Sequence, residues 1–329
     1  LPAPLMQGAL VYECSVEEYL AMPAERIAAA QIKINEMFDG IPDAVAGIPN
    51  VVEDVAAFGV PLQFDYPNSS PTLGRMRLPR FEDIPSLSCP DPTKSAELVK
   101  TLNVISALRD GIGDEKVVIG ACIAPFSLPS MLMGTAGWMR LLFTKAFRER
   151  YFEHILRVCH EFVVRWARAQ VDAGAHVIVL ADGMASATML PRAVFERFAL
   201  PAIKQVIADI GGLVAYEAVG RAEPFIDLLA DTGAVALLIG EEDDLQHCKR
   251  ATTGRCGLIG NINNMKMRRW SAARVELKAK TALNHGMPGY GFALANQGPE
   301  IPFDTSLECI GALIRAVEKY GRYEAAAAV

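Results

Sequence analysis

The residues best placed to do chemistry in this chain are polar side chains that follow short apolar runs. Glu217 is the clearest case, because Leu213 to Tyr216 form an apolar run typical of a buried strand and the carboxylate stands at its end. Such a carboxylate serves as a general acid or a metal ligand when it faces a site. The alternative is a solvated loop residue that pairs with Arg221, four residues further on.

Other apolar runs also end in polar side chains. These are Asp182, Glu241, Glu242, Asn261, Asn263, Asn296 and Gln297. Asp182 has a structural alternative as well, because an Asp followed by Gly183 commonly fixes a turn. Asn261 has one too, as a side chain that hydrogen-bonds the loop backbone. Acidic residues 241–244 also suit the amino end of a helix, where the helix dipole favours negative charge.

Strands are expected wherever a short apolar run is bounded by turn residues. The clearest runs are 116–126, 175–183, 211–220, 233–242, 256–263 and 289–298, with weaker candidates at 42–49 and 60–65. Helical patterns separate these runs, as at 141–171, and repeated strand–helix units favour a parallel sheet. Eight such units predict the α/β class and a single (β/α)8 TIM barrel over residues 41–324, after an N-terminal helical extension over residues 1–40.

Capping signals mark two helix starts. Ser15 and Glu18 have the spacing of a capping box, Thr305 to Glu308 have the same pattern, and Gly321 is expected to end the last helix. In a barrel, the carboxyl ends of all strands meet at one face, where the active site lies. The polar strand ends are therefore expected to converge on one mouth.

Composition narrows the class of partner. The chain is 51% hydrophobic, which suits a packed core, and its net charge of −6 argues against nucleic-acid binding. Its seven cysteines include no CxxC pair, which is typical of a reduced, cytoplasmic protein. No apolar stretch approaches the roughly 20 residues of a membrane span, and residues 1–13 lack the pattern of a signal peptide.

Several segments resemble one family. "GACIAPFSLPSMLMG" (120–134), "AQVDAGAHVIVLADGMAS" (169–186), "LIGNIN" (258–263) and the closing "DTSLECIGALIRAVEKYGRY" are similar to motifs of the uroporphyrinogen decarboxylase superfamily. The segment 169–186 resembles its cobalamin-linked methyltransferase branch. Tetrapyrrole decarboxylases of this superfamily carry an Arg-rich N-terminal signature, whereas residues 21–34 here offer only Arg26 and Lys33.

The resemblance also implies a zinc site, which this sequence alters. Methylcobalamin:coenzyme M methyltransferases hold zinc with a His-x-Cys motif and a later Cys, because zinc favours the thiolate that accepts the methyl group. The matching positions here are Glu217, Val219 and Asn296. Zinc is therefore expected only in a changed site, with Glu217 as the one candidate ligand.

The resemblance and the altered ligands together predict a corrinoid-dependent methyltransferase. It would move a methyl group from a methylated, possibly methoxylated, small molecule to the cobalt of a corrinoid (cobalamin). A partner corrinoid protein would supply that group, because the cobalt-binding pattern Asp-x-His-x-x-Gly is absent. Glu217 and Asp182 are the predicted catalytic residues, and the predicted binding residues are Asn261, Asn296, Met133, Met184 and Tyr216.

Two alternatives remain open at this point. One is a decarboxylase or lyase of a small carboxylic acid, which would need a cationic side chain near the mouth. The other is a barrel that binds without catalysis.

Overall fold

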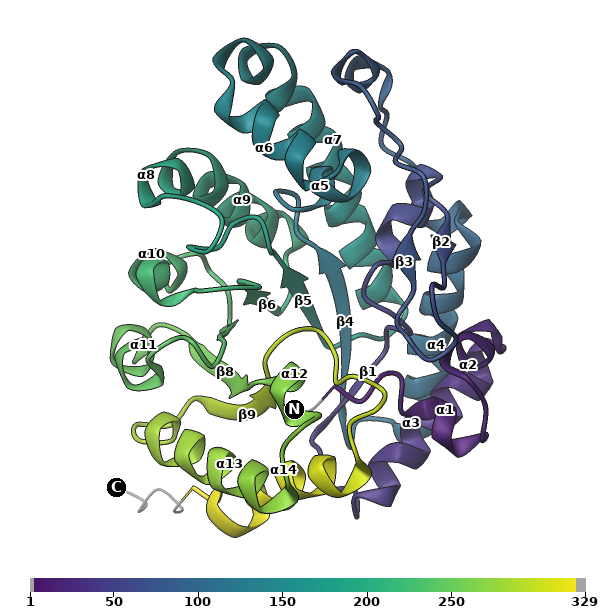
Figure 1. The fold of residues 1–329 in the computed structure, drawn as a ribbon, viewed down its shortest axis with the longest axis vertical. Coiled ribbons are helices and arrows are strands. Elements are labelled where there is room, and N and C mark those ends of the chain that lie inside the picture. Colours follow the sequence, from purple (N-terminus) through teal and green to yellow (C-terminus); the bar gives the residue numbers. More distant parts are fainter. Residues whose placement is uncertain (1–2, 324–329) are drawn as a thin grey trace.

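Seven parallel strands form one curled sheet with helices around its outside (Figure 1). The computed structural model describes residues 3–323. The sheet order is β1-β4-β5-β6-β7-β8-β9. The strands are β1 (Ala44–Ala46), β4 (Val117–Ile123), β5 (Val177–Ala181), β6 (Val214–Glu217), β7 (Ala236–Leu238), β8 (Gly257–Ile262) and β9 (Phe292–Asn296). This is an α/β barrel architecture, as the sequence predicts.

The helices alternate with these strands. They are α1 (Gly8–Val11), α2 (Val16–Ala21), α3 (Ala24–Met37), α4 (Ala96–Ile112), α5 (Leu128–Met133), α6 (Thr135–Phe143), α7 (Lys145–Asp172), α8 (Arg192–Val194), α9 (Leu200–Ile210), α10 (Ile226–Leu229), α11 (Leu245–Thr252), α12 (Asn264–Met267), α13 (Ala272–Gly286) and α14 (Leu307–Tyr320). None of the helices in the described part of the chain is long and apolar enough to cross a membrane.

Each strand presents one face to the helices and the other to the inside of the curl. In β4, Val118, Gly120 and Cys122 are buried, whereas the residues between them keep some exposure. In β5, Ile178 and Leu180 are buried and Val177 keeps some exposure. Since side chains alternate along a strand, the fully buried residues of β4 and β5 pack mainly against the helices and the residues between them line the interior.

The strand predicted at 60–65 does not join the sheet, so the expected eighth parallel strand is wrong. Residues there form β2 (Leu62–Gln63), which pairs antiparallel with β3 (Thr72–Leu73) in a separate hairpin. The segment is short and carries the exposed Gln63. A parallel strand covered on both faces is almost continuously apolar, and Gln63 interrupts the run here.

The edges of the seven-stranded sheet are β1 and β9. The N-terminal segment is tied to the loop after β9, because the Ala3 N–H donates to Asn296 Oδ1 at 2.8 Å and the Ala3 carbonyl accepts from the Ile301 N–H. Gln7, which is fully buried, donates to the Pro302 carbonyl. Residues 3–7 therefore belong to the wall of the barrel, while α1 to α3 follow them. The boundary at residue 40 stays a prediction.

The helix expected at 141–171 is interrupted at Thr144, which has an extended backbone and separates α6 from α7. The capping box of Ser15 and Glu18 is confirmed. At the last helix, Ser306 is the N-cap and accepts from the Cys309 N–H. Glu308 is thus one position too early to complete the expected box, which needs its acid at the third helical position.

Candidate functional site

Glu217 is the last residue of β6 and its side chain faces the interior of the barrel. In the parallel ladder it lies beside Ala181 of β5 and Leu238 of β7. The residue is only 4% exposed. Burial raises the pKa of Glu217 to about 7, and the Gly298 backbone N–H opposes part of that rise. Arg221 pairs with Glu223, at 3.3 Å, so the alternative of a Glu217–Arg221 surface pair is wrong.

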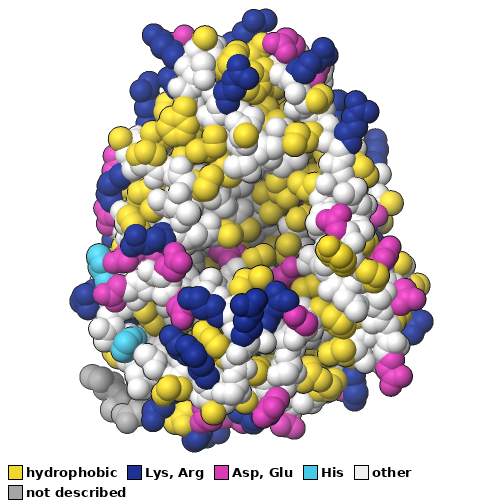
Figure 2. Space-filling view, viewed as in Figure 1, with side chains coloured by type: hydrophobic (Ala, Val, Ile, Leu, Met, Phe, Trp, Pro, Cys, Tyr) yellow, Lys and Arg dark blue, Asp and Glu magenta, His cyan; other side chains and the backbone are white. Residues whose placement is uncertain are grey.

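The interior is a cavity of about 340 Å³ that reaches from the amino ends of the strands to their carboxyl ends. Figure 2 shows the hollow in the middle of one face, with apolar side chains inside it and Lys and Arg side chains below. Four lining side chains carry a carboxyl or amide group: Asn50, Asp54, Glu217 and Asn296. The other described lining residues are aliphatic, proline, glycine or the Cys122 thiol, and no cation is among them.

Asp54 is the second carboxyl of this cavity, and the sequence analysis missed it. It lies in the short 3-10 helix Glu53–Phe58 that follows β1. Asp54 accepts from the Ile123 N–H at 2.7 Å and from Trp166 Nε1 at 3.2 Å. Burial raises its pKa to about 7. Adjacent carboxylates inside the apolar segment 51–60 were the available signal, because such pairs are rarely buried without a reason.

Asn296, predicted as a binding residue, lines the cavity and also holds its rim together. Its Nδ2 donates to the carbonyls of Gln297 and Gly298, at 3.2 and 3.0 Å, while Oδ1 accepts from Ala3. Gly298 in turn contacts the Glu217 carboxyl through its N–H. Asn296 therefore positions the backbone that meets Glu217.

Asp182 follows β5 on the opposite face of the sheet and is not part of the cavity lining. It is fully buried, accepts from the Ser127 hydroxyl, and accepts from the Ala185 N–H at 3.1 Å. The Met184 N–H donates to Ser127 Oγ at 2.9 Å. Burial raises the pKa of Asp182 to about 6 despite these hydrogen bonds. This is the geometry of a loop-fixing carboxylate, and its catalytic role stays a prediction.

Three other predicted binding residues lie outside the cavity. Tyr216 is buried on the helix side of β6, and its hydroxyl is near the Asp182 carboxylate without a hydrogen bond of ordinary geometry. Met133 and Met184 are buried in the hydrophobic core. None of the three is among the lining residues.

Asn261 lies in a neighbouring pocket with Glu241 and Trp270. Its Nδ2 donates to the Gly240 carbonyl at 3.2 Å, which is the backbone role left open above. Glu241 is held in this pocket by Lys266 and Lys278, at 2.6 and 3.1 Å. These ion pairs lower the pKa of Glu241, although burial alone would raise it.

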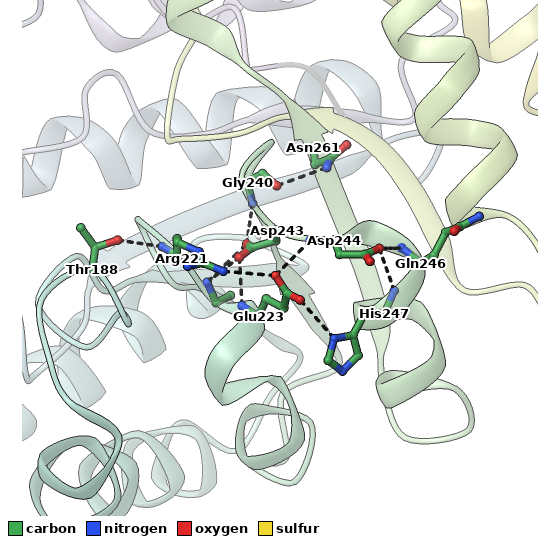
Figure 3. Close-up of polar contacts among 10 residues, drawn as sticks. Thr188, Arg221, Glu223, Gly240, Asp243, Asp244, Gln246, His247 and Asn261 are labelled. Carbon is green, nitrogen blue, oxygen red and sulfur yellow. Dashed lines mark hydrogen bonds and ion pairs between the residues drawn. The ribbon is translucent and has the colours of Figure 1, made fainter.

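The loop after Glu217 is anchored by one buried carboxylate (Figure 3). Asp243 accepts from the backbone N–H groups of Ala222, Glu223 and Gly240. Glu223 itself pairs with Arg221 and with His247 Nδ1, at 3.1 Å. The loop that continues from Glu217 is thereby fixed to the loop after β7, which limits the freedom of the catalytic candidate.

No group of three or more His, Cys, Asp or Glu side chains suited to a metal ion occurs among residues 3–323. At the positions implied by the family resemblance, Val219 is apolar and the Asn296 amide is already engaged by backbone groups. The residues present do not fit the thiolate-binding zinc site of the resembling enzymes. Of the three positions, only Glu217 keeps an ionisable side chain that could ligate a metal.

The comparison that decides the family is a match over residues 9–320 to the family model described as "Uroporphyrinogen decarboxylase (URO-D)". The chain belongs to the uroporphyrinogen decarboxylase family. This confirms the resemblance drawn from the sequence motifs.

Within this family the chain is similar to proteins of two kinds. The methylcobamide:CoM methyltransferase MtaA of Methanosarcina barkeri is 26% identical over 270 residues, covering 80% of this chain and 76% of the relative. The uroporphyrinogen decarboxylase of Aromatoleum aromaticum is 27% identical over 197 residues, covering 51% of this chain and 54% of the relative. The chain thus spans about half the length of that second relative.

The fold is shared with a solved structure described as a methyltransferase from Methanosarcina mazei. It is 22% identical, with a TM-score of 0.86, and the match covers 98% of this chain and 92% of that one. A vitamin B12-independent methionine synthase from Shewanella matches with a TM-score of 0.58 at 10% identity. At these identities the likeness shows the barrel fold alone.

Proposed function

We propose that this protein is a corrinoid-dependent methyltransferase, which moves a methyl group from a methylated small molecule to the cobalt of a corrinoid carried by a partner protein. The observation that carries the proposal is Glu217, a buried carboxyl at the mouth of an apolar cavity with a pKa near 7. The similarity to methylcobamide:CoM methyltransferases supports the corrinoid as the second substrate.

The missing thiolate-binding residues favour transfer toward cobalt. When cobalt takes the methyl carbon, the bond between that carbon and the substrate oxygen breaks, and the bonding electrons stay on the oxygen. A leaving alkoxide or phenolate then needs a proton, and general acid catalysis supplies it from a side chain whose pKa lies near the working pH. Glu217 fits this role as the protonated acid and is re-protonated from solvent afterwards.

Other residues of the cavity surround Glu217 and hold it in place for this step. The lining around Glu217 is mainly aliphatic, and Asn296 holds the Gly298 backbone against Glu217. Asp54 is fixed by Trp166 and the Ile123 N–H, and so adds a second carboxyl at a defined place in the wall.

The test is incubation of the protein with reduced cob(I)alamin and a panel of methoxyaromatic compounds. The proposal expects the absorption spectrum of methylcobalamin to appear with at least one donor. Glu217→Gln should lose this activity, whereas Glu153→Gln, the same change at an exposed position of α7, should keep it. No methylation with any donor would contradict the proposal.

The second candidate, a decarboxylase or lyase of a small acid, is supported by the family's decarboxylase members. It fits the cavity less well, because a carboxylate substrate wants a cationic partner and no described lining residue is a cation. Release of carbon dioxide from a small acid without any corrinoid would favour it.

A further inference from the structure

We propose that the substrate has a slender apolar body that lies along the barrel axis, with its methylated polar end beside Glu217. This inference rests on the proposed function and specifies the class of methyl donor. It comes from the shape and lining of the cavity, which is deeper than the methyl transfer itself requires.

The cavity extends along the full length of the strands. Its lining includes Val117 and Ile123, the first and last residues of β4, and Ala44, the first residue of β1. A rise of about 3.3 Å per residue gives a path of about 20 Å along β4. With a strand tilt of about 36°, the depth along the axis is about 16 Å.

Small side chains keep this interior hollow. The interior of a TIM barrel is ordinarily filled by layers of bulky branched side chains. Here the lining includes Ala44, Ala46, Ala121, Ala181, Ala215 and Ala236. The amino end is unfilled too, since Val117 and Val235 are 37% and 42% exposed. A hollow lined mainly by aliphatic groups is suited to an apolar ligand.

Polarity is divided between the two ends. Asn50 and Asp54 follow β1, and Glu217 and Asn296 are the last residues of β6 and β9. All four therefore lie toward the carboxyl ends of the strands, and the amino end offers only aliphatic groups. A ligand that matches this gradient carries its methoxy group at one end and an uncharged alkyl or aryl-alkyl body behind it. The volume of about 340 Å³ is within the range of small-molecule sites.

The test uses anisole, para-butylanisole and para-heptylanisole as probes, without any corrinoid. Binding is measured by calorimetry and checked by tryptophan fluorescence, to which Trp166 contributes through its hydrogen bond to the cavity residue Asp54. Burial of each added methylene should tighten binding about fourfold until the cavity is full. Equal dissociation constants across the series would overturn the inference.

Variants at the far end make the test specific. Ala236→Leu should weaken binding of para-heptylanisole at least tenfold and leave that of anisole within about twofold. Ala273→Leu, the same change at an exposed position of α13, is the matched control. If Ala236→Leu does not fold, Ala44→Val blocks the same end with less added volume. An equal effect on short and long probes would contradict the inference.

The binding assay separates this inference from the proposed function. Chain-length-dependent binding without methyl transfer to any corrinoid would support the deep apolar site and overturn the methyltransferase proposal. Methyl transfer from donors whose KM does not depend on the length of the alkyl chain would support the methyltransferase proposal and overturn the deep apolar site.

Discussion

Glu217 and Asp182 are two buried carboxyls at the ends of neighbouring strands, and they differ in the face of the sheet that they occupy. Glu217 lies beside Ala181 in the ladder, so Asp182 is one residue further along β5. Because side chains alternate, that single step turns Glu217 into the cavity and Asp182 toward the helices. Both pKa values are raised by burial, to about 7 and about 6. Burial and a raised pKa are thus common to a carboxyl that faces the cavity and one that faces away from it.

The largest expected effect is on the activity of Glu217→Gln. Removal of a general acid lowers the rate by about 10²- to 10⁴-fold, and we expect a loss of this size in kcat for methyl transfer. The melting temperature should stay the same or rise, because the amide needs no costly burial of charge. Unchanged kcat in this variant would remove Glu217 from the mechanism and end the contrast with Asp182.

Asp182→Ala should mainly lower stability. The change leaves the Ser127 hydroxyl and the Ala185 N–H without their acceptor, and each unsatisfied buried group costs about 1–3 kcal/mol. We expect the free energy of unfolding, measured in urea, to fall by about 2–4 kcal/mol. Asp182→Asn keeps an acceptor oxygen and should lose less. A stable but inactive Asp182→Ala variant would move this residue into the chemistry.

The pH dependence sharpens the same comparison. As an acid, Glu217 works only when protonated, so activity should be level below its pKa of about 7 and fall about tenfold per pH unit above it. This fall in activity above pH 7 should be absent in Glu217→Gln and retained in Asp182→Asn. If the fall persists in Glu217→Gln, another group causes it, and Asp54 is the first candidate.

The contribution of Glu217 to the free energy of unfolding should fall as pH rises. The folded pKa of Glu217 is raised from 4.5 to about 7, so between these values the folded state binds more protons than the unfolded state. Stability is therefore greatest below pH 4.5 with respect to this group, and it falls as pH rises toward 7, by about 3 kcal/mol. The difference in unfolding free energy between wild type and Glu217→Gln should change across this window and be constant above it.

The smallest effects are expected at the two amides. Asn296→Ala removes three hydrogen bonds and should lower the free energy of unfolding by about 1–3 kcal/mol, with a rise in KM as the Gly298 backbone moves. Asn261→Ala removes one bond, to the Gly240 carbonyl, and should cost about 1 kcal/mol with little change in KM. If both variants raise KM equally, the pocket that contains Asn261 also takes part in substrate binding.

The sequence predicted the parallel strands well where the apolar runs were continuous. The runs at 116–126, 175–183 and 256–263 contain β4, β5 and β8. It failed at 60–65, where a short apolar run belongs to a hairpin, because periodicity in two residues cannot distinguish a sheet strand from a turn. The interruption at Thr144 escaped notice for a similar reason, since the hydrophobic pattern continues across it.

The candidate site could be predicted only in part. The apolar run locates Glu217 at a strand end, but it does not indicate which side Glu217 faces, because all four residues of β6 are buried. The side of Asp182 depends on where β5 ends by a single residue. Asp54 was missed because it comes eight positions after β1, in a 3-10 helix that carries no strand-end signal. Its approach to the cavity is set by Trp166 and Ile123, which are distant in the sequence.

Asp243 shows how the β6 loop can act as one dynamic unit with the β7 loop. Its carboxylate is the shared acceptor for the amide protons of Ala222, Glu223 and Gly240. Those protons can exchange with solvent only when the contact with that carboxylate opens, and such openings are cooperative events. The amide protons of Ala222 and Glu223, in the loop after β6, and that of Gly240, in the loop after β7, should then exchange at a common rate. Bound substrate should slow the exchange of all three together.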